Sequence, residues 1–220
     1  MTHEAYMSLE AHALLQELIG TEREIATRDT VPRMRQEARD AYLPRAERAV
    51  ARTGVTVEEI VIAGQPCLDI RPPGASEGTV LYCYGGGYIT GSVREDLIVS
   101  AALAAGAEAR IVAVDYPLAP EHPWPAACDA AWTVFQALSA EGPIALAGES
   151  AGGNLALSVM QQAGAEPLAV LLLSPWCDLT HGGDSLAAND ARDPSLSRAQ
   201  LHAAAALYAG DADAARPGIS

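Results

Sequence analysis

Residues 146–154 constrain this chain more than any other segment, because their letters L-A-G-E-S-A-G-G-N place a serine between closely spaced glycines. An apolar run typical of a strand precedes them, and a helical pattern follows. A strand that passes directly into a helix needs a tight turn, and Gly148 and Gly152 leave room that side chains would fill. The segment therefore predicts a strand, a sharp turn at Ser150, and a helix whose N-terminus lies beside the serine hydroxyl.

Strand and helix patterns alternate along most of the chain. Strands are predicted at 57–62, 67–71, 79–83, 110–114, 144–147 and 168–174, and helices at 94–106, 125–138, 150–162 and 197–208. A turn at Gly64 joins the first two strands, which predicts a hairpin. The alternation after residue 79 predicts an α/β fold with a mostly parallel central sheet and flanking helices.

The N-terminal part of the chain lacks strand patterns and carries amphipathic stretches instead. Residues 8–19 predict one helix. Residues 21–24 are typical of a capping box that opens a second helical stretch, and Pro32 permits a restart of the helix. We expect residues 1–54 to form a helical cap region, which either covers a pocket or packs on the core, and residues 55–220 to form the core.

Composition restricts the partners and the compartment. The net charge of −14 disfavours nucleic acid and anionic membranes as partners. Four cysteines without zinc or redox spacing predict free thiols in a reducing compartment, here the cytoplasm: Cys67, Cys83, Cys128 and Cys177. We also see neither a signal peptide at the N-terminus nor an apolar run of membrane-spanning length.

Three segments can converge on one site. Three glycines at 85–87 follow a strand and let backbone N–H groups approach an anion, although a plain glycine turn is the alternative. The turn at Ser150 follows a second strand. Residues 115–125 follow a third strand, and their spaced prolines predict a rigid extended loop.

Four ordered motifs make the chain similar to the bacterial branch of the hormone-sensitive lipase family of α/β-hydrolases. The family carries H-G-G-G, D-Y-R-L-A-P-E-H-P-F-P-A and G-D-S-A-G-G-N-L-A. Here these motifs stand as Y-G-G-G, D-Y-P-L-A-P-E-H-P-W-P-A and G-E-S-A-G-G-N-L-A. Residues 174–180 also match the family's S-P-x-x-D-L-T. The resemblance runs from about residue 55 to the end and implies an α/β-hydrolase fold.

The resemblance implies a serine carboxylesterase that hydrolyses short-chain carboxylic esters without a metal or cofactor. Ser150 would be the nucleophile and would carry the acyl-enzyme. The backbone N–H groups of Gly86, Gly87 and Ala151 would form the oxyanion hole, where fixed dipoles stabilise the negative oxygen of the tetrahedral intermediate. Lactone or amide hydrolysis on the same serine is not separated from this reaction by the sequence.

The sequence also suggests residues that could form pocket walls, and it departs from the family motifs at several positions. Tyr88, Trp124 and Trp176 are candidates for substrate-binding walls, and each fits a plain core position equally well. Tyr84 replaces the first histidine of H-G-G-G, which in the family mainly shapes the loop. Glu149 replaces an aspartate beside the nucleophile. A proline also stands where the family's D-Y-R-L-A-P motif has arginine.

The family order is serine, then acid, then histidine, and the sequence lacks an obvious later pair. His181 follows the S-P-W-C-D-L-T motif and His202 lies on the last predicted helix, so we expect surface or cap roles for both. His122 is expected to be structural. The aspartates from 178 to 193 come too early to be the family's acid. We therefore expect the triad Asp and His on missing or companion sequence, with the core C-terminally incomplete.

An independent argument concerns residues 168–173, which are apolar on both faces, as in a central parallel strand. Without later strands they would form an open apolar edge, which proteins avoid because it templates aggregation. We therefore expect a companion polypeptide or a swapped segment to complete the sheet of a fragment or a cleaved hydrolase. The alternative is a natural short pseudoenzyme that binds a small molecule without catalysis.

Overall fold

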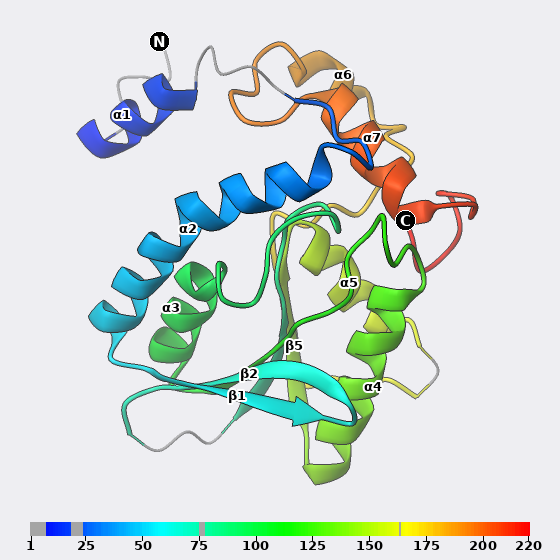
Figure 1. The fold of residues 1–220 in the computed structure, drawn as a ribbon. Helices are drawn as coiled ribbons and strands as arrows, with labels where there is room; N and C mark the ends of the chain where they lie inside the picture. The colour runs from blue at the N-terminus through cyan, green and yellow to red at the C-terminus, as the bar shows by residue number, and fades with distance from the viewer. Residues whose placement is uncertain (1–7, 19–23, 75–77, 163) are drawn as a thin grey trace.

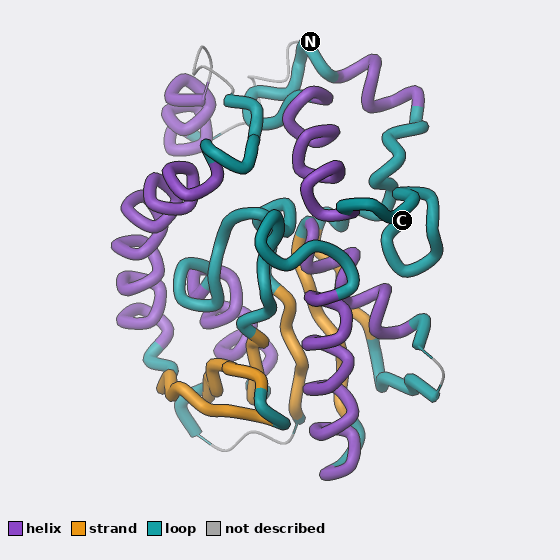
Figure 2. The backbone as a smooth tube through the Cα atoms, turned by 45° about the vertical axis from the view of Figure 1, so that its right-hand side comes forward, coloured by secondary structure: helices purple, strands orange, loops and turns teal. Residues whose placement is uncertain are grey.

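The computed structural model describes residues 8–18, 24–74, 78–162 and 164–220. A twisted sheet lies at the centre, with helices α2 (Val31–Thr53) and α3 (Leu97–Ala107) on one side. Helices α4 (Ala126–Glu141) and α5 (Ala151–Met160) lie on the other side (Figures 1 and 2). The observed α/β-hydrolase architecture confirms the predicted fold class.

Six described strands form one sheet in the order β1-β2-β4-β3-β5-β6. Their bounds are β1 Thr56–Ile62, β2 Gln65–Arg71, β3 Thr79–Cys83, β4 Arg110–Val114, β5 Ile144–Glu149 and β6 Val170–Leu173. The first two strands form the predicted hairpin, and β2 pairs antiparallel with β4. The pairs β4–β3, β3–β5 and β5–β6 are parallel. Because crossover helices cover both faces, the central strands are apolar on both sides.

Three further helices complete the described part: α1 (Leu9–Leu18), α6 (Asp184–Asn189) and α7 (Arg198–Ala209). The predicted capping box of α7 is confirmed, because Ser197 accepts from the N–H of Gln200 while the Gln200 side chain accepts from the N–H of Ser197. Helix α6 was not predicted. Helix α3 begins at Leu97 and continues past Gly106, with Glu108 as its left-handed C-cap at φ 51°.

The N-terminal region differs from the prediction in one place. Residues 24–27 are not helical and residues 28–30 form a turn, so α2 begins at Val31 with proline in its first turn. The expected second helical stretch is therefore wrong before residue 31, and residues 19–23 lie outside the described part. Helix α2 packs along α3 (Figure 1). The division at residue 54 stays a prediction.

The edge strand β6 exposes apolar side chains. Leu171 is 43% exposed and Leu173 is 38% exposed. Among the described strands, only β5 pairs with β6. Part of the large apolar surface expected for residues 168–173 is therefore open in the described structure.

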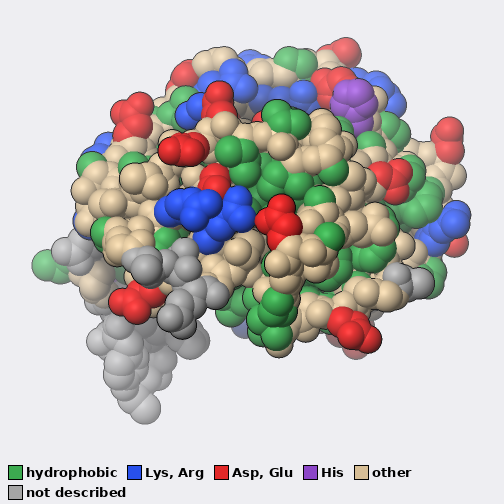
Figure 3. Space-filling model, turned by 90° about the horizontal axis from the view of Figure 1, so that it is seen from below, with side chains coloured by type: hydrophobic (Ala, Val, Ile, Leu, Met, Phe, Trp, Pro, Cys, Tyr) green, Lys and Arg blue, Asp and Glu red, His purple; other side chains and the backbone are tan. Residues whose placement is uncertain are grey.

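Two expectations from composition can be compared with the structure. All four cysteines are free thiols, three of them buried and Cys177 exposed. None of the described helices is both long enough and apolar enough to cross a membrane. On the face shown in Figure 3, acidic and basic side chains interleave among hydrophobic ones.

Candidate active site

Ser150 lies at the sharp turn between β5 and α5. Its φ of 51° and ψ of −121° are unusual for a residue with a side chain, so the surrounding structure must hold it there. The Ser150 N–H donates to the Leu173 carbonyl at 3.0 Å, and its carbonyl accepts from the Trp176 N–H at 2.9 Å. Hydrogen bonds to the segment that follows β6 thus fix the turn from one side.

The glycines around Ser150 are required by close backbone contacts. A Cβ atom on Gly148 would lie 2.2 Å from the Gly152 carbonyl oxygen. A Cβ atom on Gly152 would lie 2.1 Å from the Cys83 carbonyl oxygen. Because neither space admits a methyl group, the two glycines allow the start of α5 to press against the ends of β5 and β3.

The glycine segment after β3 forms a tight turn at Gly86. Its φ is 119°, and a Cβ atom there would lie 2.1 Å from the Thr90 carbonyl oxygen. The Gly86 carbonyl accepts from the Thr90 N–H at 2.9 Å, which closes the turn. Within the described residues, the N–H groups of Gly86, Gly87 and Ala151 form no hydrogen bond. These donors are therefore available to a ligand.

A cavity of about 220 Å³ brings Ser150, Gly86, Gly87 and Trp176 together. Residues from the N-terminal part and from α7 close it, namely Glu24, Ala26, Met34, Gln200, Leu201 and Ala204. The glycine segment and the serine turn thus meet at this cavity, whereas none of residues 115–125, the third segment expected there, lines it. The N-terminal segment contributes to the cavity walls. Of the two alternatives for this region, covering a pocket or packing on the core, the first therefore fits residues 24–34.

The side chains of Tyr88 and Trp124 do not line this cavity. Tyr88 is fully buried, its hydroxyl donates to Asn154 Oδ1 at 2.5 Å, and its ring stacks on Tyr208 at 3.6 Å. With φ at 63°, Tyr88 packs against α5 and α7 instead. The Trp124 ring contacts the guanidinium of Arg216 at 4.7 Å. Both residues therefore correct the expectation of pocket walls.

The later histidines lie close together but outside the serine cavity. His181 and His202 approach through their Nδ1 atoms at 3.1 Å, and neither is among the described residues that line the cavity. His202 is exposed, but His181 is buried, which corrects the expected surface position. The Asp178 carboxylate accepts from the Gly182 N–H at 2.9 Å, so the chain folds back at His181. Burial, followed by the charge of His202, lowers the pKa of His181.

Arg35 on α2 connects the N-terminal part to the glycine turn after β3 and to the loop after β4, and the sequence did not predict this role. Its guanidinium donates to the carbonyl of Ile89 at 2.8 Å and to that of Ala119 at 2.7 Å. It also pairs with Glu121 at 2.7 Å. No local pattern could have identified this residue, because its partners are more than 50 positions away. His122, next to Glu121, is exposed.

Tyr84, which stands in place of the family's histidine, forms a reciprocal pair with Tyr116. The Tyr116 hydroxyl donates to the Tyr84 carbonyl at 2.6 Å, and the Tyr84 hydroxyl donates to the Tyr116 carbonyl at 3.3 Å. The rings stack with centroids 4.2 Å apart. Burial raises the pKa of both hydroxyls well above the usual range, so the pair is uncharged. It ties the start of the glycine turn to the end of β4.

Comparisons with known proteins agree with the observed fold. A family model described as alpha/beta hydrolase fold matches residues 80–220. The structure resembles the crystal structure of EstE5 soaked in ethyl alcohol, with a TM-score of 0.87, 28% identity, and coverage of 97% of this chain and 73% of that one. A crystal structure of a hormone-sensitive lipase from a metagenome library gives a TM-score of 0.84 at 32% identity, covering 95% of this chain and 72% of that one.

The chain belongs to the hormone-sensitive lipase family of the alpha/beta hydrolase fold. Similar curated proteins include an "Esterase" of Acinetobacter venetianus, 34% identical over 71% of this chain and 54% of that protein. An "Acetyl-hydrolase" of Streptomyces hygroscopicus is 34% identical over 82% of this chain and 64% of that protein. The matches thus span between about half and two thirds of the length of these two relatives.

Proposed function

We propose that this chain carries the nucleophile of a serine carboxylesterase acting on short-chain carboxylic esters. The observation that carries the proposal is the position of Ser150. It lies in a left-handed turn at the N-terminus of α5 and shares a cavity with Gly86 and Gly87. A serine in such a turn presents its hydroxyl to a substrate while nearby backbone donors face the same point.

The chemistry begins when Ser150 Oγ attacks the ester carbonyl carbon. Negative charge then develops on the carbonyl oxygen, and the N–H groups of Gly86, Gly87 and Ala151 donate to it. The aligned peptide dipoles of α5 add to the stabilisation at its N-terminus. Removing one donor of this kind typically costs about 3 kcal/mol of transition-state stabilisation.

The proposed reaction also needs a base and an acid. A histidine accepts the Ser150 proton and delivers it to the departing alcohol oxygen, and a carboxylate orients that histidine. Water then attacks the acyl-enzyme and gives a proton to the histidine, which returns it to Ser150 Oγ as the bond to the acyl group breaks and the acid leaves. The described residues around the cavity include no histidine. We assign the histidine and the acid to missing sequence or to a companion polypeptide. The exposed apolar edge of β6 supports the addition of further strands there.

The size and lining of the cavity support a small acyl group. A space of about 220 Å³ with Met34, Trp176 and Leu201 among its walls suits a short apolar chain. The relative called "Acetyl-hydrolase" supports the same substrate class. We further propose a cytoplasmic location, which the four free cysteines favour.

A second candidate is a pseudoenzyme that binds a small molecule without catalysis. The same observation that the described cavity walls include no histidine favours it. The two candidates differ in the reactivity of Ser150, because an activated serine reacts with electrophiles and an unassisted one does not.

A fluorophosphonate labelling experiment separates the two candidates. The purified protein is treated with the reagent, and the intact mass is read under denaturing conditions. The esterase proposal expects stoichiometric labelling that disappears in Ser150→Ala and persists in Ser185→Ala, which changes an exposed serine. Because the base is assigned to companion sequence, a chain that stays unlabelled in a preparation containing the companion polypeptide would overturn the esterase proposal and favour the binder. The same spectrum reveals any companion polypeptide as a second mass.

A further inference from the structure

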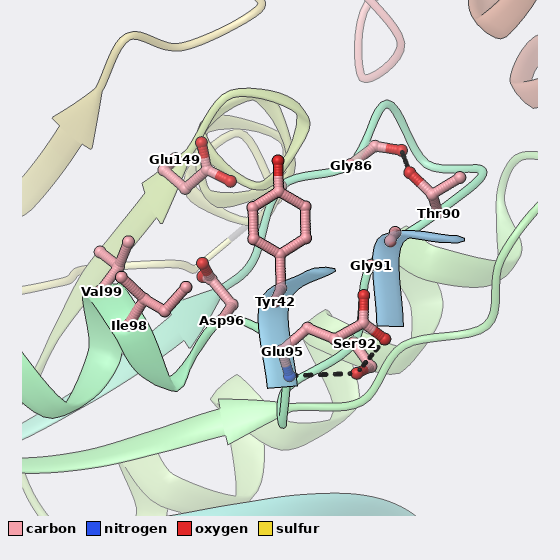
Figure 4. Close-up of a pocket in the computed structure, with 12 residues that line it drawn as sticks. Tyr42, Gly86, Thr90, Gly91, Ser92, Glu95, Asp96, Ile98, Val99 and Glu149 are labelled. Atoms are coloured by element: carbon pink, nitrogen blue, oxygen red, sulfur yellow. Dashed lines mark hydrogen bonds between the residues drawn. The ribbon is translucent and has the colours of Figure 1, made fainter. Parts of the chain in front are cut away.

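A second cavity lies on the other side of the turn formed by residues 86–90. Its volume is about 360 Å³, and Gly86 and Thr90 line both this cavity and that of Ser150. Carboxyl groups of Glu95, Asp96 and Glu149 surround it, and Figure 4 shows the Tyr42 ring standing among them. We call this space the acidic cavity.

Glu95 carries the clearest sign of an absent partner in the acidic cavity. Its side chain is only 6% exposed. Atom Oε1 accepts from Ser92 Oγ at 2.9 Å and lies 4.0 Å from Arg39 Nε. Atom Oε2 is buried and has no hydrogen-bond partner among the described residues. Because a buried carboxylate oxygen without a donor is costly, Oε2 is suited to accept from a bound molecule.

The other two carboxyl groups strengthen the negative field. The Tyr82 hydroxyl donates to Asp96 Oδ2 at 2.5 Å, but no described ion pair involves Asp96 or Glu149. Burial raises the pKa of Asp96 to about 7, and burial also raises that of Glu149. Each carboxyl group is thus poorly compensated when ionised, and a cation would stabilise the ionised forms.

The lining of the acidic cavity selects the kind of cation. Among the described residues, no group of three or more His, Cys, Asp or Glu could hold a metal ion. The cavity instead has room for several heavy atoms, and Ile98 and Val99 supply apolar walls. The Tyr42 ring offers a face on which a cation can rest. Among cations, one with N–H groups can donate a hydrogen bond to Glu95 Oε2, which a metal ion or a quaternary ammonium cannot.

We propose that the acidic cavity binds a small primary alkylammonium ion, with an N–H group donating to Glu95 Oε2 and the alkyl chain against Ile98 and Val99. Asp96 and Glu149 provide the surrounding negative charge, and Tyr42 covers the ammonium group. This site is separate from that of Ser150 and does not depend on the proposed ester hydrolysis.

Isothermal titration calorimetry with n-butylammonium chloride at pH 8 tests the proposal directly, without an activity readout. We expect saturable binding of one ion per chain. Neutral n-butanol should give no saturable binding, because it lacks the charge. Tetramethylammonium should bind roughly tenfold or more weakly, because it lacks the N–H group that Glu95 Oε2 requires.

Variants assign the binding to the acidic cavity. Glu95→Gln should weaken n-butylammonium binding roughly tenfold or more, whereas Glu58→Gln, an exposed change of the same chemistry, should leave it unaltered. Tyr42→Leu changes an exposed side chain on α2 and should also weaken binding, which keeps the test available if Glu95→Gln does not fold. The proposal would be overturned if n-butylammonium showed no saturable binding, or if n-butanol bound equally well. It would also be overturned if a folded Glu95 or Tyr42 variant bound n-butylammonium with the same affinity as the Glu58 variant.

Discussion

The two cavities on either side of residues 86–90 share a wall but have opposite chemistry. The Ser150 cavity presents backbone N–H groups and apolar side chains, and Glu24, the one carboxylate among its described lining residues, is paired with Arg33. The acidic cavity presents three carboxyl groups, of which only that of Glu95 lies near a guanidinium. One glycine turn thus separates donors suited to an anion from acceptors suited to a cation.

This difference shows why the turn contains glycine. Gly86 lines both cavities, and a side chain there would clash with the Thr90 carbonyl, so the turn can close as it does only with glycine at this position. Negative charge behind the turn also opposes negative charge in front of it, since the charges lie within one Debye length in a poorly solvated region. We therefore expect protonation or a bound cation in the acidic cavity to favour the oxyanion proposed at Ser150.

The largest expected effect is a loss of ester hydrolysis that leaves ligand binding in the acidic cavity unchanged. Ser150→Ala removes the proposed nucleophile, so ester hydrolysis by the intact enzyme should fall by about 10⁴-fold or more. Alkylammonium binding in the acidic cavity should not change. Steady-state kinetics with p-nitrophenyl acetate and calorimetry on the same preparation measure both quantities. A parallel loss of alkylammonium binding would show that the two sites are not independent.

Gly86→Ala should damage both cavities at once. A Cβ atom would lie 2.1 Å from a backbone oxygen at a φ of 119°, so strain and overpacking should lower the free energy of unfolding by about 3 kcal/mol. Gly74→Ala is a matched control, because its φ is 107° but no atom of the described residues beyond its chain neighbours lies within 4 Å of the added Cβ. Gly74→Ala should lower the free energy of unfolding by about 1 kcal/mol. Urea denaturation measures both, and equal losses would contradict the steric argument.

Arg35→Gln should weaken the wall that α2 adds to the Ser150 cavity. The change removes the ion pair with Glu121 and the charge-assisted bonds to two loop carbonyls, for a loss of about 1–2 kcal/mol of unfolding free energy. Arg48→Gln, an exposed change on the same helix, should alter stability by less than about 0.5 kcal/mol. Thermal denaturation compares the two variants. If both lose the same stability, the contacts of Arg35 do not anchor α2.

A last prediction concerns the pH dependence of the acidic cavity, where the effect is spread over several pH units. Because burial raises the folded-state pKa of Asp96 to about 7 from 3.8, the folded state holds a proton that the unfolded state releases between these values. This group therefore lowers the free energy of unfolding as pH rises from about 4 to 7, by up to about 4 kcal/mol, since each tenfold change in proton affinity is worth roughly 1.4 kcal/mol. Asp96→Asn should remove that decline.

Urea midpoints at several pH values from 4.5 to about 8 test the Asp96 prediction. Asp29→Asn, at an exposed turn position, serves as the control and should keep the wild-type pH dependence. A pH profile of Asp96→Asn that matches the wild-type profile would assign the decline to other groups.

Much of the fold could be predicted because its signals are local. The alternation of apolar residues located all six described strands to within about two residues at nearly every boundary. The motif around Ser150 predicted its turn, because Gly148 and Gly152 are required by close contacts with backbone a few residues away or on the neighbouring strand. The convergence of Ser150 with Gly86, Gly87 and Trp176 followed from the order of the motifs.

Other features could not be predicted because they depend on residues far apart in the chain. Tyr88 packs on Tyr208, 120 positions later, and not on the cavity. The burial of His181 depends on α7, which brings His202 against it. Glu95 and Asp96 share a cavity with Tyr42 of α2 and Glu149 of β5, which lie about 50 positions away on either side in the chain.

The sequence by itself therefore determined the succession of strands and helices, the serine turn and the family. Hydrophobic periodicity and backbone sterics act over a few residues, so their marks remain readable in a linear chain. The tertiary structure alone decided which side chains share a cavity and which of them lack a partner. Those properties arise when segments such as α2, the glycine turn and α7 pack together, because burial and electrostatic environment depend on neighbours that the linear order does not specify.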